Sequence, residues 1–183
     1  MNEINEINEI NEINEINQID GYTKYHEYVK NIIFDKNIID FKSNIIYKDM
    51  LEHVSFDLGK QYYRYILDTN IITLDKIKEF IGLNDKYGNP QLYDYGNIKC
   101  SPSSLRYIFH SYLILSYIKK LNKNMIDIVE IGGGYGGLCL AINFFSDIFN
   151  IKINNYHIID LEYVIELQKM YLSLHNINNI NNI

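Results

Sequence analysis

A glycine-rich segment in the second half of the chain holds the residues best suited to chemistry. Residues 129–138 read VEIGGGYGGL, with five glycines among residues 132–137. Glycines allow the backbone to turn sharply and to approach a ligand that a Cβ atom would block. The segment fits both ExGxGxG, counted from Glu130, and GxGxxG, so it predicts a loop that binds a nucleotide-like cofactor. The candidate cofactor-binding residues are Glu130, Gly132, Gly133, Gly134, Tyr135, Gly136, Asp160 and Leu161.

Charge distinguishes the two classes of cofactor that these glycines fit. A dinucleotide would bring an anionic pyrophosphate to the loop, whereas S-adenosylmethionine would bring a sulfonium and an ammonium group. The carboxylate of Glu130, two residues before the first glycine, disfavours an anion and favours cations. The segment therefore favours S-adenosylmethionine. An NAD(P)-binding module and a glycine turn without a ligand are the alternatives.

Asp160 is the second carboxylate of the candidate site. It follows the apolar segment Tyr156–Ile159, at the end of a predicted strand. A carboxylate in this place accepts hydrogen bonds from the ribose hydroxyls of either class of cofactor. The alternative role of Asp160 is to cap a helix that is predicted to begin near Glu162.

The segments around these two carboxylates predict a βαβ unit. Ser101 and Pro102 are typical of a helix start, and the segment 125–131 is rich in β-branched residues. Parallel strands that are joined through a helix leave the ligand beyond their carboxyl ends. Residues 101–175 are therefore predicted to be a partial Rossmann-like domain of an α/β protein. The predicted elements are a helix from 102 to 121, a strand over 125–131, a helix over 137–149, a connection over 150–155, a strand over 156–159 and a helix over 162–174.

The first part of the chain is predicted to be helical and to follow a disordered repeat. Residues 2–16 are five copies of Asn-Glu-Ile, and a period of three matches neither a helix nor a strand. Residues 1–20 and a similar tail at 176–183 are therefore predicted to be disordered, with an interaction arm as the alternative role of the first repeat. Residues 21–100 are predicted to be a helical N-terminal region and linker. This region has helical spacing in Tyr22–Phe34, Asp57–Leu67 and Leu74–Ile81, and a predicted loop over Gly82–Cys100.

Composition excludes several classes of function. The five Glu residues of the repeat supply five of the six net negative charges, so the rest of the chain is nearly neutral. It has no basic patch for nucleic acid, since Lys119 and Lys120 suit the last turn of a helix. Cys100 and Cys139 are isolated, which favours neither a disulfide nor a metal site. The chain shows no signal peptide and no apolar run of membrane-spanning length, so a cytoplasmic protein is predicted.

Several of these segments resemble a known family. SPSSLRY at residues 101–107, VEIGGGYGGL, YHIIDL at residues 156–161 and LQK at residues 167–169 are similar to sugar O-methyltransferases that depend on S-adenosylmethionine. The resemblance covers Leu51–Leu174. It implies a class I methyltransferase fold, with Glu130, the glycines and Asp160 on the cofactor and a carbohydrate as the acceptor. Where the family leads us to expect a proline, this chain has Glu162, a change that a helix start tolerates.

The sequence assigns no general base. Arg106 lies on the helix before the first strand, where we expect it to be solvated, with a place at the mouth of the site as the alternative. His110 and His157 stand among apolar residues, without a partner at the spacing of a catalytic pair. We therefore expect both histidines to be packed rather than catalytic.

The predicted sheet is smaller than the implied fold requires. After Asp160 the sequence has one helix and a tail, so the strand over 125–131 would keep a bare apolar edge. An active enzyme would need a homodimer or a second chain to complete the sheet. The alternatives are an inactive, truncated remnant and an oligomerising fragment.

Overall fold

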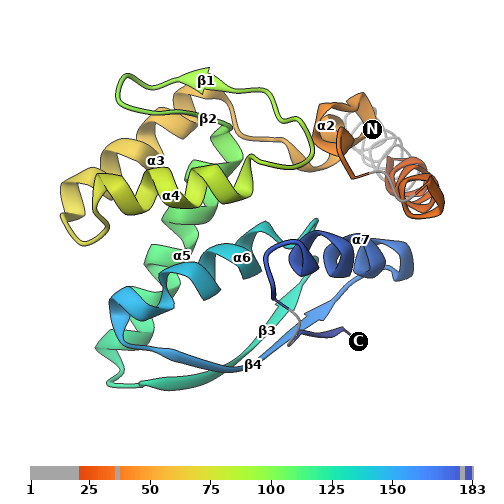
Figure 1. Ribbon diagram of the computed structural model, residues 1–183. Helices are drawn as coiled ribbons and strands as arrows, with labels where there is room; N and C mark the ends of the chain where they lie inside the picture. The colour runs from red at the N-terminus through yellow and green to blue at the C-terminus, as the bar shows by residue number, and fades with distance from the viewer. Residues whose placement is uncertain (1–20, 36–37, 178–179, 183) are drawn as a thin grey trace, which may run out of the picture.

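The molecule consists of two layers. The computed structural model describes residues 21–35, 38–177 and 180–182, so the Asn-Glu-Ile repeat and its alternative role as an interaction arm lie outside the described residues. In Figure 1 the first half of the chain forms a helical layer with a short hairpin, and the second half forms a small sheet with helices over it. The long helix α5 (Pro102–Lys120) links the two layers.

Short helices with polar caps build the first layer. One helix covers residues 21–35, and the others are η1 (Phe41–Ser43), α2 (Ile45–Leu51), α3 (Phe56–Thr69) and α4 (Leu74–Asn84). The side chains of Asn44, Ser55 and Thr73 accept hydrogen bonds from amides in the first turns of α2, α3 and α4. These caps satisfy donors that a helix leaves free at its start. The three segments with helical spacing in the sequence lie within these helices.

The segment Gly82–Cys100 is more regular than the predicted loop. Helix α4 continues to Asn84, and β1 (Tyr93–Asp94) pairs antiparallel with β2 (Lys99–Cys100). Gly96 has a φ of 93° in the turn between these strands. Strands of two residues carry no periodic pattern, so only the turn residues of this hairpin are visible in the sequence.

Helix α5 agrees with the prediction. The side chain of Ser101 accepts a hydrogen bond from the amide of Ser104 at 3.2 Å, Pro102 lies in the first turn, and Lys119 and Lys120 lie in the last turn. The helix packs against α3 on one side and against α6 (Gly137–Phe145) on another. Burial on two sides explains why its apolar residues lie nearly all round.

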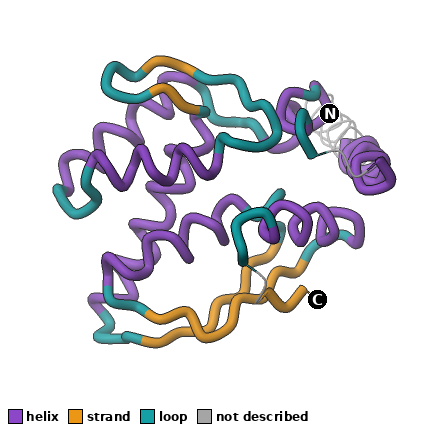
Figure 2. Tube along the Cα trace, in the orientation of Figure 1, coloured by secondary structure: helices purple, strands orange, loops and turns teal. Residues whose placement is uncertain are grey.

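The sheet contains three parallel strands in the order β3-β4-β5. Figure 2 shows the strands alternating along the chain with helices. The structure confirms that the protein is mixed α/β, with a sheet that is small. The elements after α5 are β3 (Met125–Ile131), α6, η2 (Ser146–Phe149), β4 (Lys152–Ile159), α7 (Glu162–Ser173) and β5 (Ile180–Asn182).

Two strands differ from the sequence predictions. Strand β4 begins at Lys152, inside the predicted connection, and the side-chain amides of Asn154 and Asn155 donate to Asp127 on β3 at 2.9 and 2.6 Å. These asparagines look like loop residues in the sequence, but their amides are satisfied across the sheet. Ile180–Asn182, predicted as part of a disordered tail, pairs with β4. The free edge of β4 offers backbone partners to a segment without an apolar alternation.

Among the described residues, helices cover one face of the sheet and leave the other open. Helices α6 and α7 lie on the same side of the strands (Figure 1), and the side chains of Tyr156 and Ile158 are buried beneath them. On the opposite face Met125, Val129 and Ile131 are 53%, 61% and 80% exposed. Strand β3 has no partner along its outer edge among the described residues. The bare apolar edge that the sequence predicts is therefore present, and it adjoins a bare face.

A buried polar cluster around Asn84 joins the two layers. The Asn84 Nδ2 atom donates to the Ser104 hydroxyl at 2.8 Å, and Oδ1 accepts from the hydroxyls of Tyr135 and Tyr171 at 3.1 and 3.0 Å. The Asn84 carbonyl accepts from Lys42 Nζ at 2.6 Å. These partners come from α5, the glycine segment, α7 and η1. One asparagine therefore hydrogen-bonds elements of both layers, beside the apolar core that they share.

Candidate site at the glycine turn

The glycine segment forms a tight turn at the carboxyl ends of β3 and β4. Gly132, Gly134 and Gly136 have φ angles of 74°, 57° and 95°, a region that residues with a Cβ rarely adopt. The Gly132 amide donates to the carbonyl of Ile159 at 2.9 Å, and the Gly136 amide donates to the carbonyl of Gly133 at 2.9 Å. The first bond ties the turn to the end of β4, so the turn lies beside Asp160.

Three of the five glycines are required by packing. A Cβ at Gly133 would lie 2.7 Å from Cγ2 of Ile158, and a Cβ at Gly136 would lie 2.8 Å from Cδ1 of Leu172. A Cβ at Gly137 would overlap an aromatic ring on α5. These glycines let α6 approach the sheet, α5 and α7 closely, so their presence does not depend on a ligand.

Two glycines lie on the open side of the turn. A Cβ at Gly132 would meet no atom within 4 Å, and a Cβ at Gly134 would meet only Leu51, at 3.6 Å. Packing therefore does not explain why these positions are glycine, although their positive φ angles do so in part. The open side of the turn is the surface that a ligand can approach.

Glu130 lies on the helix-covered face of β3, half-buried below the turn. Its Oε2 atom accepts a hydrogen bond from the Tyr156 hydroxyl on β4 at 2.8 Å. Burial raises the pKa of Glu130, the bond from Tyr156 lowers it, and the charge on Asp160 raises it again, with a net upward shift. The fold therefore keeps this carboxylate near a second negative charge.

Asp160 follows β4 and contacts the turn. Its Oδ1 accepts from the amide of Leu161 at 2.8 Å, and its Oδ2 accepts from Nε2 of Gln168 at 2.8 Å. The same Gln168 nitrogen donates to the Gly134 carbonyl at 2.9 Å, so one side chain bridges the carboxylate and the turn. Burial raises the pKa of Asp160, while these hydrogen bonds and the nearby amides of Gly133 and Gly134 lower it, with a net upward shift.

The alternative role of Asp160 as a helix cap does not match the structure. The N-cap of α7 is Leu161, and no side chain accepts a hydrogen bond from its first turn. Leu161 itself is 46% exposed at the edge of the site. The Asp160 carboxylate is turned toward the glycine turn, where a ligand would lie.

The side chain of Tyr135 points away from the open side of the turn. It is 1% exposed, and its hydroxyl donates to Asn84 in the core. Lys42 Nζ lies 4.1 Å from the centroid of its ring, and burial lowers the pKa of Lys42 to about 8. Of the predicted cofactor-binding residues, Tyr135 therefore offers only its backbone to a ligand, because its side chain anchors the turn in the core.

Arg106 lies beside Leu51, which adjoins the turn at Gly134, whereas His110 and His157 show no contact with the turn among the described residues. Arg106 is partly buried and donates to the carbonyl of Leu51 at 3.5 Å, so it is not the solvated residue that was expected. The ring of His110 packs against that of Tyr62, with centroids 6.2 Å apart, and burial lowers its pKa. His157 lies on β4 with a buried Nδ1 that has no hydrogen-bond partner in the described chain. The packed role expected for His110 is confirmed.

The sequence assigned no role to the polar residues that hold the two carboxylates, although both lie in segments that carry the family resemblance. Tyr156 and Gln168 are distant from the glycine segment in sequence, yet Tyr156 bonds Glu130 and Gln168 bonds Asp160. The sequence signal for Gln168 was weak, because it lies nearly two turns inside α7 among residues that pack on the core. Leu51 of α2 was also missed, and its side chain borders the open side of the turn near Gly134.

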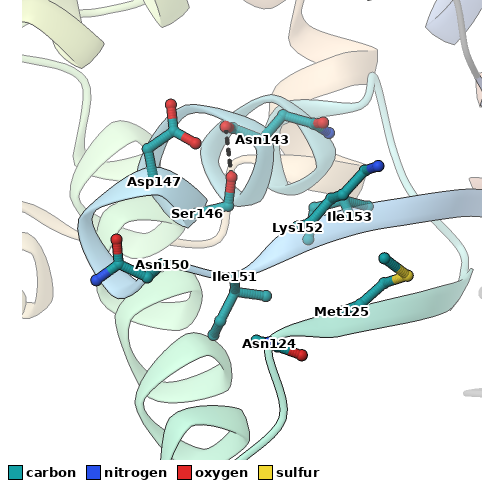
Figure 3. Close-up of a pocket in the computed structure, with 9 residues that line it drawn as sticks. All are labelled: Asn124, Met125, Asn143, Ser146, Asp147, Asn150, Ile151, Lys152 and Ile153. Carbon is teal, nitrogen blue, oxygen red and sulfur yellow. Dashed lines mark hydrogen bonds between the residues drawn. The ribbon is translucent and has the colours of Figure 1, made fainter.

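A separate hollow lies at the opposite end of the strands from the glycine turn. Its volume is about 680 Å³, and Figure 3 shows its lining residues around the first residues of β3 and β4, with the Ser146 hydroxyl bonded to the carbonyl of Asn143. Ligands of parallel α/β sheets bind beyond the carboxyl ends of the strands, and this hollow lies at the amino ends. The glycine turn therefore remains the candidate site.

Two cysteines and the acidic side chains are the other groups that we considered for chemistry. Cys100 and Cys139 are free and buried, and burial raises the pKa of both thiols. Within residues 21–35, 38–177 and 180–182, no group of three His, Cys, Asp or Glu side chains is arranged to hold a metal ion. Over the same residues, no helix is both long and apolar enough to cross a bilayer.

Comparisons with known proteins add no family assignment. No family model, no curated protein and no solved structure matches this chain. The proposals below therefore rest on the geometry of the site and on the resemblance in the sequence.

Proposed function

We propose that the glycine turn between β3 and α6 binds S-adenosylmethionine. The observation that carries this proposal is the pair of half-buried carboxylates, Glu130 and Asp160, beside a turn whose glycines leave one side open. Both carboxylates have pKa values raised by burial, and Asp160 raises that of Glu130 further. A bound ligand with a sulfonium and an ammonium group would relieve this repulsion.

The topology of the sheet supports a Rossmann-like interpretation. The order β3-β4-β5, with α6 and α7 on one face, agrees with one half of a doubly wound fold, whose first three strands lie in the spatial order 3-2-1. In such folds the ligand lies outside the carboxyl ends of the strands, on the turn after the first strand. That turn is the glycine segment of this chain.

A dinucleotide is the second candidate ligand. The fingerprint GxGxxG and the position of Asp160 fit NAD equally well. However, the pyrophosphate of NAD would approach a turn that already has Glu130 and Asp160 beside it. Like charges in a partly buried site are unfavourable, so the charge of the site favours the methionine cofactor.

The activity we propose is transfer of the methyl group to a sugar hydroxyl. It is supported by the resemblance of residues 101–107, 129–138 and 156–161 to sugar O-methyltransferases. Methyl transfer from a sulfonium needs an acceptor oxygen in line with the methyl group and a group that takes its proton. The bare edge of β3 and the bare face of the sheet leave room for a second chain or a second copy to supply the acceptor side.

Calorimetric titration with S-adenosylmethionine, S-adenosylhomocysteine and NAD tests the cofactor assignment. We expect micromolar binding of the first two ligands, strong weakening in Glu130→Gln and Asp160→Ala, and no change in Glu166→Gln. Glu166 is a matched control because it lies on α7 near the site but is half exposed and paired with Lys169. Binding of NAD alone would overturn the proposal. If none of the three ligands binds, the alternative of an inactive remnant is favoured.

A further inference from the structure

The Tyr25 hydroxyl is a buried polar group without a partner. Tyr25 lies on the helix over residues 21–35 and is 4% exposed, and its hydroxyl makes no hydrogen bond to any described residue. Nearly all buried polar groups in folded proteins are hydrogen-bonded to protein or ligand atoms or to ordered water. The exceptions are therefore places to look for a ligand.

The helix over residues 21–35 lies against the end of β4 that carries the candidate site. The ring of His26 packs against that of Tyr163, with centroids 4.9 Å apart, and Tyr163 is three residues after Asp160. The Tyr28 hydroxyl donates to the carbonyl of Phe41 at 3.2 Å, which ties the helix to η1. These contacts hold the helix beside the carboxylate.

The electrostatics of Tyr25 agree with this placement. Burial raises the pKa of the Tyr25 phenol, and the next largest contribution is the charge on Asp160, followed by Tyr107 on α5. The phenol therefore lies within electrostatic range of the Asp160 carboxylate. The Asp160 oxygens accept from Leu161 and Gln168 rather than from Tyr25.

A second tyrosine hydroxyl, that of Tyr95, is also buried without a partner among the described residues, and it lies elsewhere. The ring of Tyr95 lies 6.4 Å from that of Tyr63, where α3 meets the hairpin of β1 and β2. Burial raises the pKa of Tyr95, and the next largest contribution comes from Cys100 rather than from a carboxylate of the site. An unpartnered hydroxyl is thus not enough to indicate a ligand, and Tyr25 is distinguished by its place beside Asp160.

We propose that Tyr25 and Asp160 together bind the vicinal diol of a nucleoside ribose, with the helix over residues 21–35 as the cover of the site. This inference rests on the proposed function, because it assumes that a nucleoside ligand occupies the glycine turn. A carboxylate accepts hydrogen bonds, and a phenol donates one; a diol both donates and accepts. A sulfonium offers no acceptor to Tyr25, and a phosphate would be repelled by Asp160.

The test compares Tyr25→Phe with Tyr95→Phe, since each removes one buried hydroxyl that has no partner among the described residues. We expect Tyr25→Phe to weaken binding of S-adenosylhomocysteine and of adenosine by about three- to tenfold, the usual worth of one hydrogen bond. Tyr95→Phe is expected to leave both affinities unchanged. Both variants are expected to melt at or above the temperature of the parent, because an unpaired buried hydroxyl is removed.

The ligand supplies the second arm of the test. Binding of 2′,3′-dideoxyadenosine is expected to be equal in the parent and in Tyr25→Phe, because this probe lacks the diol. Equal affinity of the parent and Tyr25→Phe for adenosine would overturn the inference, as would an equal loss with the dideoxy probe. NAD also carries ribose diols. If NAD alone binds, the methionine cofactor is excluded, and the affinities of the parent and of Tyr25→Phe for NAD test the role of Tyr25. Absence of binding by every ribose-containing probe would overturn both proposals.

Discussion

The two carboxylates at the glycine turn place opposite demands on stability and binding. Glu130 has a raised pKa because it is buried and lies near Asp160, so its charged form is disfavoured by the fold. The same negative charge is what a cationic ligand would recognise. Residues of this kind are typical of sites at which stability is given up for function.

Glu130→Gln is expected to raise thermal stability at neutral pH while it weakens cofactor binding. A carboxyl group with a raised folded-state pKa contributes stability that is present below its ordinary value of 4.5 and is lost as the pH rises through the raised value. The parent should therefore melt below Glu130→Gln at pH 7.5, and the difference should shrink toward pH 4. Thermal melts across this range measure it. A variant that melts below the parent at pH 7.5 would show that the Tyr156 hydrogen bond outweighs the repulsion.

Replacing a glycine of the turn by alanine is expected to lower the free energy of unfolding, whereas replacing a glycine inside a helix is expected to raise it. Gly136→Ala should destabilise the fold by about 3 kcal/mol, because of the positive φ angle and the contact with Leu172. Gly82→Ala should stabilise it by about 1 kcal/mol, since Gly82 lies within α4 and a Cβ there meets no atom within 4 Å. Urea unfolding measures both. Equal effects of the two changes would contradict the packing argument.

Helices α4, α5 and α7 share one apolar core, and the side chain of Asn84 adds hydrogen bonds among them. The Asn84 side chain accepts hydrogen bonds from the hydroxyls of Tyr135 and Tyr171 and donates one to Ser104 on α5. Its backbone carbonyl accepts a hydrogen bond from Lys42. Buried polar groups are favourable only when all of them are paired. The orientation of the elements around the turn therefore depends on this cluster.

Asn84→Leu is expected to destabilise the protein by about 3 kcal/mol, because the Tyr135 hydroxyl loses its partner and the hydroxyls of Ser104 and Tyr171 each lose one hydrogen bond. The midpoint of urea unfolding should fall, and near-ultraviolet circular dichroism should report the change in the tyrosines. Gln61→Ala is the control, since Gln61 is exposed on α3 and its change should stay within about 0.5 kcal/mol. A loss in Asn84→Leu as small as that of the control would mean that the cluster does not orient the helices.

In the part of the chain that the structure describes, helices cover one face of the sheet and leave the other exposed. The covered face holds Tyr156 and Ile158, while Val129 and Ile131 of β3 face outward beside an edge that has no partner among the described residues. An exposed apolar strand with a free edge is a surface on which other chains pair. The expectation of a homodimer or a second chain remains a prediction, and it concerns this surface.

Val129→Lys is expected to reduce self-association of the chain with little change in melting temperature. Val129 is 61% exposed, and lysine on an edge strand opposes pairing by charge. Light scattering after size exclusion, over a range of concentrations, gives the mass of the parent and of the variant. Leu113→Lys on α5, at a residue that is 41% exposed, is the control and should associate as the parent does. A parent that stays monomeric at every concentration would contradict the prediction.

The sequence by itself determined the elements that local rules specify. The glycine turn between β3 and α6, the cap of α5 at Ser101 and the start of α7 at Glu162 follow from backbone geometry and short-range periodicity. The carboxylates Glu130 and Asp160 were identified because they adjoin a strand end. Strand β5 was missed because it forms by pairing with the edge of β4 and carries no pattern of its own.

The tertiary structure alone decided which side chains surround the turn. The side chain of Tyr135 lies in the core, where it bonds Asn84, and three of the glycines are needed for close packing. Tyr25 lies within electrostatic range of Asp160. The bond between Asn84 and Tyr171 joins residues 87 positions apart. Local propensity carries no information on such distances, because these contacts form only when apolar burial brings helices from both halves of the chain together.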